Sequence, residues 1–303
     1  MEIRHVTLTS APADEKAVLA LGFFDGVHAA HLALLRKTVE LAAGQHVKSG
    51  VFTFDEISTI AKNHVHLTGA EDRASRIADA GIDVLYVASF AELRGLAPTD
   101  FISFLRGTCG AVHAVCGFNF RFGKDAAGTP DDLVRLMDGN ADVLPPMNVG
   151  GEPISTTRIR KLLEDGRPDE AKALLGRAFA LTAPVEHGKA LGRRLGTPTI
   201  NQHFPAALVI PRRGVYRTTC TVRGKTYDAV TNVGVCPTVG GATVTAESYL
   251  FDFTGDLYDE VVETAFLTFL RPEQQFADAD ALAAQIRSDL SSVCSAIAEK
   301  ETT

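Results

Sequence analysis

The sequence predicts a two-domain chain, in which a doubly wound parallel α/β sheet is followed by an antiparallel β-barrel with a terminal helix. Three observations support this prediction. The chain has 303 residues, 46% of them hydrophobic, which is enough for two moderate cores. Apolar strand patterns alternate with helix patterns through the first half. In the second half the segments become short, rich in Val, Thr and Tyr, and separated by Gly and Pro.

The first half shows the strand–helix alternation of a parallel sheet. Strands are predicted at 17–22, 50–54, 82–88, 111–116 and 141–144, and helices near 30–43, 70–80, 99–108 and 129–138. Thr129-Pro130-Asp131-Asp132 predicts a helix start, with a cap, Pro at the first helical position and acids in the first turn. Gly44 is predicted to close the first helix. Two short helices follow near 156–165 and 168–175, the second ending at Leu175-Gly176.

The second half carries the pattern of an antiparallel barrel. Strands are predicted at 206–210, 214–222, 225–233, 243–253 and 261–269. A final helix, roughly Asp278 to Ala298, has apolar residues at helical spacing and is expected to pack against the barrel. The change of pattern near 176–183 predicts an N-terminal domain of residues 1–180 and a C-terminal domain of residues 181–303.

Composition argues against several classes of function. The formal net charge is -7, and the 30 Lys and Arg residues form no basic block, so neither nucleic acid nor a membrane surface is expected as a partner. We find no apolar run of membrane-spanning length and no secretory pattern over Met1–Asp14. The 5 cysteines are widely spaced and lack a C-x-x-C pair, which favours reduced thiols over a zinc site. We therefore expect a soluble cytoplasmic protein; its oligomeric state is not predicted.

The segment 22–31, at the end of the first long strand, predicts a phosphate-binding site. Gly22 and Gly26 allow a tight turn, and the helix that follows offers free N–H groups and the positive end of its dipole to an anion. His28 and His31 then share one helical face. Taken alone, this spacing would more often mean one buried and one exposed histidine at a helix start. In open α/β sheets, however, ligands bind beyond the carboxyl ends of strands, which is where these histidines are expected.

A second phosphate motif is predicted at Ile154–Arg160. A helix cap accounts for one of its hydroxyls, whereas the segment holds Ser155, Thr156 and Thr157. Arg158 and Arg160 add forked cationic donors suited to phosphate oxygens. We expect this segment to face His28 and His31 and to clamp a triphosphate.

The glycine-bounded loop 117–123 lies between these motifs in sequence and is a candidate for base or flavin recognition. Asn119 could bind a base through its amide, and Phe118 and Phe120 could stack on an isoalloxazine ring. The alternative is a turn that covers the core.

The segment 186–201 predicts a second nucleotide site in the barrel. Gly188, Gly192 and Gly196, with Arg193 between them, can wrap phosphates, although the segment is not a Walker P-loop. Thr199 and Asn201 alternate on an extended backbone, so both point the same way and offer neutral oxygens to Mg²⁺. Alone, such a segment would more often be a surface loop.

Together these segments resemble the bifunctional riboflavin kinase/FMN adenylyltransferase family of bacteria, over nearly the whole chain. In that family the first half resembles GNFDGVHxGH, a GxNFRFG-type loop and ISSTRIR, matched here by 22–31, 117–123 and 154–160. The second half resembles the barrel motifs at 188–201, 214–216, 232–238, 247–258 and 270–276.

The resemblance implies two ATP-dependent reactions of FAD biosynthesis. The barrel would phosphorylate riboflavin to FMN, with Glu247 as proton acceptor and Thr199 and Asn201 as ligands to Mg²⁺ and phosphate. The nucleotidyltransferase-like N-terminal domain would adenylylate FMN to FAD and release pyrophosphate. Further positions carried over from the family are His28, His31 and Arg160 for catalysis, Gly22, Phe24 and Asp25 for the nucleotide, and Arg271 for the flavin.

Some positions depart from the family pattern. Phe23 stands in place of an Asn, Ala30 in place of the glycine between the histidines, and Asp55-Glu56 where Pro-His-Pro is usual. In the barrel, Asp259 replaces a glycine. Two alternatives are therefore kept: a riboflavin kinase with a catalytically weak N-terminal domain, and a flavin- or nucleotide-sensing protein. Glu247 argues against the sensor, because binding alone needs no base.

Overall fold

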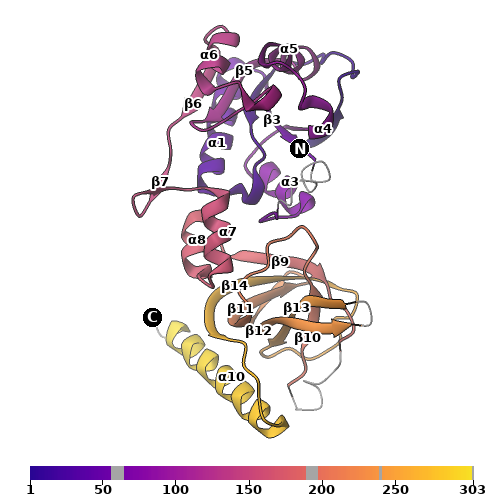
Figure 1. Cartoon of the computed structure of the whole chain (residues 1–303), viewed down its shortest axis with the longest axis vertical. Coiled ribbons are helices and arrows are strands. Elements are labelled where there is room, and N and C mark those ends of the chain that lie inside the picture. The colour runs from indigo at the N-terminus through magenta and orange to yellow at the C-terminus, as the bar shows by residue number, and fades with distance from the viewer. Residues whose placement is uncertain (56–64, 189–196, 239–240, 302–303) are drawn as a thin grey trace. The chain divides into compact units, whose positions relative to one another are not determined.

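The computed structural model describes residues 1–55, 65–188, 197–238 and 241–301. The chain forms two compact units, Met1–Thr156 and Thr157–Thr303 (Figure 1). This division comes earlier than the sequence-based boundary at 180/181, because α7 (Thr156–Glu164) and α8 (Pro168–Leu175) group with the second unit. Within that unit α8 packs against the barrel strands β9 and β14. The boundary at 180/181 stays a prediction.

The first unit is built on a parallel sheet with the strand order β1-β4-β3-β2-β5-β6. Its strands are β1 (Glu2–Val6), β2 (Ala17–Leu21), β3 (Lys48–Phe54), β4 (Val84–Ala88), β5 (Ala111–Gly117) and β6 (Ala141–Leu144). The parallel sheet is confirmed, and β1 is an edge strand that the periodicity did not indicate. The chain leaves β2 toward β3 on one side and returns to β5 on the other, which places the switch in strand order beside the end of β2.

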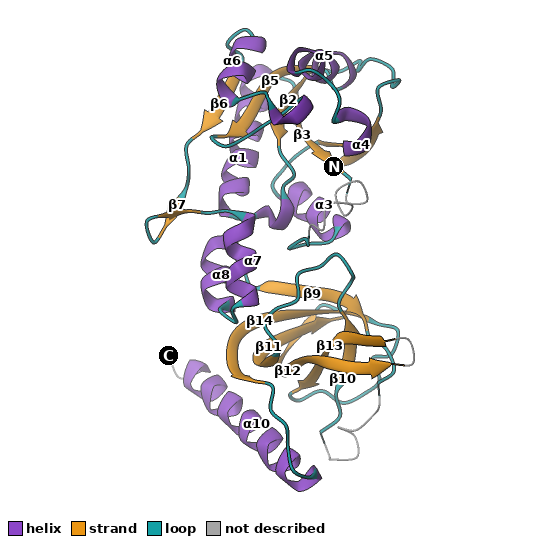
Figure 2. Cartoon of the chain, viewed as in Figure 1, coloured by secondary structure: helices purple, strands orange, loops and turns teal. Residues whose placement is uncertain are grey.

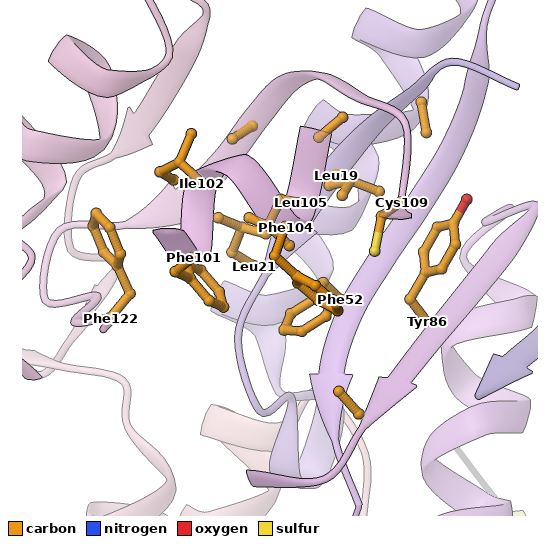
Figure 3. Packing of buried hydrophobic residues seen from close by; sticks show 14 of the residues in the cluster. Leu19, Leu21, Phe52, Tyr86, Phe101, Ile102, Phe104, Leu105, Cys109 and Phe122 are labelled. Carbon is orange, nitrogen blue, oxygen red and sulfur yellow. The ribbon is translucent and has the colours of Figure 1, made fainter. Parts of the chain in front are cut away.

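Helices cover both faces of this sheet. They are α1 (Ala29–Gln45), α3 (Ala70–Asp79), α4 (Phe90–Leu93), α5 (Pro98–Thr108) and α6 (Pro130–Leu136). The same unit has two 3-10 turns, η1 (Asp25–Val27) and η2 (Lys124–Ala126), and a short hairpin formed by β7 (Asn148–Val149) and β8 (Glu152–Pro153). Alternate residues of β2 enter opposite cores. Val18 and Ala20 pack in the core that holds Leu35 of α1, whereas Leu19 and Leu21 pack with α5 (Figure 3).

The ends of two helices can be compared with the capping residues predicted from sequence. Thr129 forms a full capping box with Asp132, as predicted. The prediction that Gly44 closes α1 is wrong. The left-handed position is occupied by His46, whose N–H bonds the Ala43 carbonyl while the Val47 N–H bonds that of Ala42. This pattern is a Schellman motif, and it lets α1 run through Gly44.

The second unit is an antiparallel sheet with the strand order β10-β13-β12-β11-β14-β9 (Figure 2). The strands are β9 (Phe179–Pro184), β10 (Ile200–His203), β11 (Gly214–Val222), β12 (Lys225–Thr238), β13 (Gly241–Leu250) and β14 (Val261–Pro272). A bridge between Glu186 and Asn201 joins the segment after β9 to β10 and closes the barrel. The predicted strand at 206–210 is wrong. Leu208 and Val209 are buried there in a loop, flanked by Pro205 and Pro211, which cannot donate to a strand ladder.

The barrel interior contains a buried polar chain as well as apolar side chains. The Gln202 amide donates to the carbonyls of Ala183 at 2.8 Å and Val262 at 2.7 Å and accepts from the Thr264 hydroxyl at 2.6 Å. These bonds tie β10 across the barrel to β9 and β14, and they fix which face of β10 points inward. The terminal helix α10 (Ala279–Glu301) packs through Leu290 and Val293 against the outer face of the sheet.

Candidate functional site

The turn after β2 has an unusual backbone. Phe24, Gly26 and Val27 all have positive φ, at 58°, 77° and 38°. Only Gly26 adopts this region without steric cost, and Val27 is β-branched. Strain of this kind persists where surrounding contacts impose it, and it clusters at functional sites. The Phe24 side chain is itself buried in the α1-side core and its ring lies 5.1 Å from that of His31. Any contact of Phe24 with a nucleotide would therefore come from its backbone.

His28 and His31 form a stacked pair at the start of α1. His28 caps the helix, since its Nδ1 accepts the His31 N–H at 3.3 Å, and the two rings stack with centroids 3.6 Å apart. An accepting Nδ1 carries no proton, so the neutral His28 ring carries its proton at Nε2.

The environment of His31 keeps its ring neutral. Burial holds the pKa of His31 well below its ordinary value, and repulsion from His28 lowers it further whenever the His28 ring takes up a second proton. Its Nδ1 is buried without a hydrogen-bond partner among the described residues. Near neutral pH, His31 therefore offers hydrogen bonds from a neutral ring and not a positive charge.

The Asp25 side chain is buried, and its carboxylate accepts hydrogen bonds from backbone N–H groups of the protein. Oδ1 accepts the N–H groups of Leu67 at 2.7 Å and Thr68 at 3.3 Å, and the Gly26 N–H donates to the Thr68 hydroxyl at 3.2 Å. The Thr156 hydroxyl donates to the Asp25 carbonyl at 3.4 Å, which brings the start of the second phosphate motif beside the turn. The role of Thr68 was not predicted, because it is 42 residues from Gly26 in the chain and only the fold brings them together.

The remaining residues predicted for this site are distributed over both compact units. Ser155 is half-buried, and Thr157, Arg158 and Arg160 belong to the second compact unit. Their clamp on a triphosphate stays a prediction. Gly22 lies at the end of β2, where its N–H donates to the Phe52 carbonyl at 3.3 Å and an added Cβ would lie 3.2 Å from the Phe24 ring.

The loop 117–123 divides its aromatic side chains between solvent and core. Phe118 is 44% exposed and Asn119 is exposed, so both are available to a ligand. Phe120 instead stacks on Phe122 with centroids 5.8 Å apart and packs against the core. The alternative of a core-covering turn therefore holds for Phe120, whereas flavin or base contact by Phe118 and Asn119 stays a prediction.

In the barrel, strand register places the predicted kinase residues in one row. Asn201 of β10 pairs with Glu247 of β13, Glu247 with Asn232 of β12, Asn232 with Val215 of β11, and Val215 with Arg271 of β14. The next row, Gln202, Ala246 and Val233, is fully buried inside the barrel. Because side chains alternate along a strand, the row from Asn201 to Arg271 lies on the outer face.

Two glycines bring the backbone close to the side chains of Asn201 and Asn232. Gly188 passes over the Asn201 amide, and a Cβ at residue 188 would collide with it. A Cβ on Gly234 would lie 2.5 Å from Glu273 Oε1 and 3.0 Å from Asn232 Nδ2, so these two polar groups flank Gly234. Neither Asn232 nor Glu273 was singled out from sequence. Gly192, Arg193, Gly196 and Glu56 lie outside the described residues.

Arg271 is engaged by the terminal helix. Its Nε and Nη2 form a fork on the Asp289 carboxylate at 3.0 Å and 2.7 Å, and Gln285 donates to the same carboxylate at 2.9 Å. Asp289 is 8% exposed. Arg271 therefore ties β14 to α10 at the end of the row, and its contact with a flavin stays a prediction. The role of Asp289 was missed, because a lone acid in an amphipathic helix carries no signal of its partner.

The cysteine side chains that the structure describes are free thiols. Cys109, Cys116 and Cys220 are free and buried, and Cys294 is free and exposed. Burial raises the pKa of Cys109 and of Cys116 to about 12 and that of Cys220 to about 11, so these groups are neutral thiols. Within the described ranges, no cluster of three His, Cys, Asp or Glu side chains has metal-binding geometry.

Comparison with known proteins matches both units. The family model for riboflavin kinase matches residues 175–297, and that for FAD synthetase matches residues 10–158. The chain is 32% identical to a bifunctional riboflavin kinase/FMN adenylyltransferase of Listeria monocytogenes, over 95% of this chain and 94% of the relative. The proteins of the same description from Pseudomonas fluorescens and Escherichia coli are each 34% identical, over 92% and 95% of both chains.

A solved structure shares the fold of the whole chain. The crystal structure of a protein from Streptococcus pneumoniae, described as a macrolide-efflux protein, has a TM-score of 0.86 and 29% identity, covering 96% of this chain and 98% of that one. Among the described residues, no helix is both long enough and apolar enough to span a membrane.

Proposed function

The chain belongs to the bifunctional riboflavin kinase/FMN adenylyltransferase family, and we propose from this premise which residues carry each of its reactions. It is an ATP-dependent enzyme of FAD biosynthesis that phosphorylates riboflavin to FMN and adenylylates FMN to FAD, with release of pyrophosphate. The barrel carries the first reaction and the parallel-sheet unit the second.

The row Asn201–Glu247–Asn232 is the observation that supports the kinase assignment. A ribityl hydroxyl is neutral and needs a proton acceptor as its oxygen attacks the γ-phosphorus of ATP, and the Glu247 carboxylate takes that proton. The new O–P bond forms as the bond from the γ-phosphorus to the bridging oxygen breaks, and ADP leaves. Asn201 pairs directly with Glu247, which places an amide beside the base.

Mg²⁺ fits the oxygens next to this base. The Thr199 hydroxyl and the Asn201 amide are hard neutral oxygen donors two residues apart in the chain, and Asn201 lies in the Glu247 row. Mg²⁺ usually keeps several waters and phosphate oxygens, so a partial protein ligand set is sufficient. When bound there, the ion would neutralise phosphate charge. The glycine segment from Gly188 onward would hold the remaining phosphate oxygens.

Adenylyl transfer makes different chemical demands from the kinase reaction, and the turn after β2, with His28 and His31, can meet them. The FMN phosphate is already an anion, so it attacks the α-phosphorus of ATP without a base, and pyrophosphate leaves. His28 offers its Nε2–H, His31 offers a neutral ring, and the start of α1 offers backbone N–H groups. Arg160 and the hydroxyls of 155–157 supply the second set of phosphate donors, and Phe118 and Asn119 contact the flavin or the base.

A product assay tests the assignment. Purified protein is incubated with riboflavin, ATP and Mg²⁺, and riboflavin, FMN and FAD are separated over time. We expect FMN first and FAD afterwards. FMN that accumulates without FAD would favour a catalytically weak N-terminal unit, and absence of FMN would contradict the kinase assignment. We place the reactions in the cytoplasm, where free thiols such as Cys109 stay reduced.

A further inference from the structure

We infer that Arg73 is a positioning residue of FMN adenylylation, which acts by fixing the turn that carries His28. The inference rests on the proposed assignment of that reaction to the first unit. Arg73 lies on α3, 45 residues after His28 in the printed sequence, and it belongs to none of the phosphate motifs.

Arg73 binds the ends of two neighbouring parallel strands. Its Nη1 donates to the Phe23 carbonyl at 3.3 Å and its Nη2 to the Phe54 carbonyl at 3.2 Å. These carbonyls follow or end β2 and β3, which pair in the sheet. The guanidinium carbon also lies 4.6 Å from the centroid of the Phe23 ring, within the range of a cation–π contact. Arg73 is only 5% exposed, so the side chain is committed to this position.

The rest of the same segment holds the remainder of the turn. The Leu67 and Thr68 N–H groups bind the Asp25 carboxylate, and the Thr68 hydroxyl accepts the Gly26 N–H. The Thr53 hydroxyl adds a bond to the Phe23 carbonyl at 3.0 Å. Segment 67–73 therefore contacts the turn at Phe23, Asp25 and Gly26, immediately before His28.

The turn needs this support because its backbone is strained. Left-handed non-glycine residues such as Phe24 and Val27 are energetically unfavourable and persist only where contacts impose them. Arg73 fixes the entry to the turn, at Phe23, and Asp25 fixes its middle. Loosening the entry would let Phe24 and Val27 relax and would move the His28 ring, although every side chain that binds phosphate would still be present.

Arginine suits this task better than lysine. The planar fork reaches two carbonyls on different strands and lies against a ring at the same time, whereas a lysine ammonium is a compact point charge. Arg73→Lys should therefore recover part, not all, of the positioning.

The test compares Arg73→Met with Arg73→Lys in the full-length protein. The matched control is Arg76→Met, because Arg76 lies on the same helix and pairs with Asp72 at 2.8 Å, with both side chains partly exposed. Each variant is assayed for FAD formation from FMN, with kcat and KM for ATP, and for FMN formation from riboflavin. Wild-type FAD formation is measured first, so that failure of the proposed function is distinguished from failure of this inference.

We expect Arg73→Met to lower kcat for FAD formation at least tenfold with little change in KM for ATP, and Arg73→Lys to fall in between. FMN formation, and both activities of Arg76→Met, should stay within twofold of wild type. Unchanged kcat in Arg73→Met would overturn the inference, as would a loss confined to KM. Should Arg73→Met fail to fold, Arg73→Lys and Thr68→Val decide the matter: wild-type kcat in both would overturn the inference.

Discussion

The two sites of this chain are assembled by different means. In the first unit, a strained turn between β2 and α1 is held by side chains from a segment more than 40 residues away, through Asp25, Thr68 and Arg73. In the barrel, strand register alone sets the row Asn201–Glu247–Asn232. A site built on register tolerates change in neighbouring side chains, whereas a site built on a strained turn depends on its supports.

This contrast extends to the chemistry. The turn after β2 offers hydrogen-bond donors to an anion and needs no base, so its function depends on how precisely its backbone is positioned. The row offers one carboxylate at a defined place, so its function rests on one side chain. Substitutions that test the comparison should therefore have sharply different effects.

The largest effect is expected for Glu247→Gln. The change removes the proton acceptor with little change in shape, so FMN formation should fall on the order of a hundredfold or more. FAD formation from supplied FMN should be unaffected. Glu263→Gln, a carboxylate on β14 outside the row, is the matched control. A fall of less than about tenfold in FMN formation would refute the role of Glu247.

A smaller effect concerns the pH dependence of stability. The folded state holds the pKa of His31 well below its ordinary value, so the unfolded chain binds a proton that the folded chain does not. The free energy of unfolding should therefore fall as pH drops below about 6.5, by at most about 1.4 kcal/mol per pH unit for this one group.

His31→Asn removes this titrating group. Denaturant unfolding of wild type and variant between pH 7 and pH 5 should show a shallower pH dependence in the variant. Parallel curves would show that His31 titrates alike in the folded and unfolded chains.

The smallest effects come from restoring two family glycines. Asp259 has φ 65°, so Asp259→Gly should relieve left-handed strain and stabilise the barrel by about 0.5–1 kcal/mol. Ala30 lies in the first turn of α1, so Ala30→Gly should cost up to about 1 kcal/mol. Calorimetry of both variants should give shifts of opposite sign, and shifts of the same sign would contradict this account.

Ala30→Gly has a second readout. If the Ala30 methyl crowds the nucleotide, FAD formation rises in spite of the lower stability, while FMN formation stays unchanged. If FAD formation stays level, the methyl lies away from the nucleotide and Ala30 is a tolerated change.

Much of the fold could be predicted from local pattern. The parallel sheet, the barrel and the terminal helix follow from periodicity, and Thr129 follows from capping chemistry. The strand at 206–210 was predicted wrongly because an apolar run is buried as readily in a loop between prolines. Short strands such as β10, with four residues, gave too little periodicity to detect.

In the two sites, likewise, some residues could be predicted from local sequence and others could not. Motif residues such as His28 and Glu247 could be chosen from sequence, but their supports could not, because Thr68, Arg73 and Asp289 reach their partners only through the fold. The neutral state of His31 likewise depends on burial, which spacing alone does not reveal.

Complementation between two variants tests most directly the central claim that each unit carries one reaction. His28→Asn keeps a residue suited to capping α1 while removing the imidazole, and Glu247→Gln removes the kinase base. Given riboflavin, ATP and Mg²⁺, Glu247→Gln should leave riboflavin unchanged and His28→Asn should stop at FMN. An equimolar mixture should make FAD, because FMN released by one protein is adenylylated by the other. No FAD from the mixture would contradict the claim, as would loss of FMN formation in His28→Asn or failure of Glu247→Gln to convert supplied FMN to FAD.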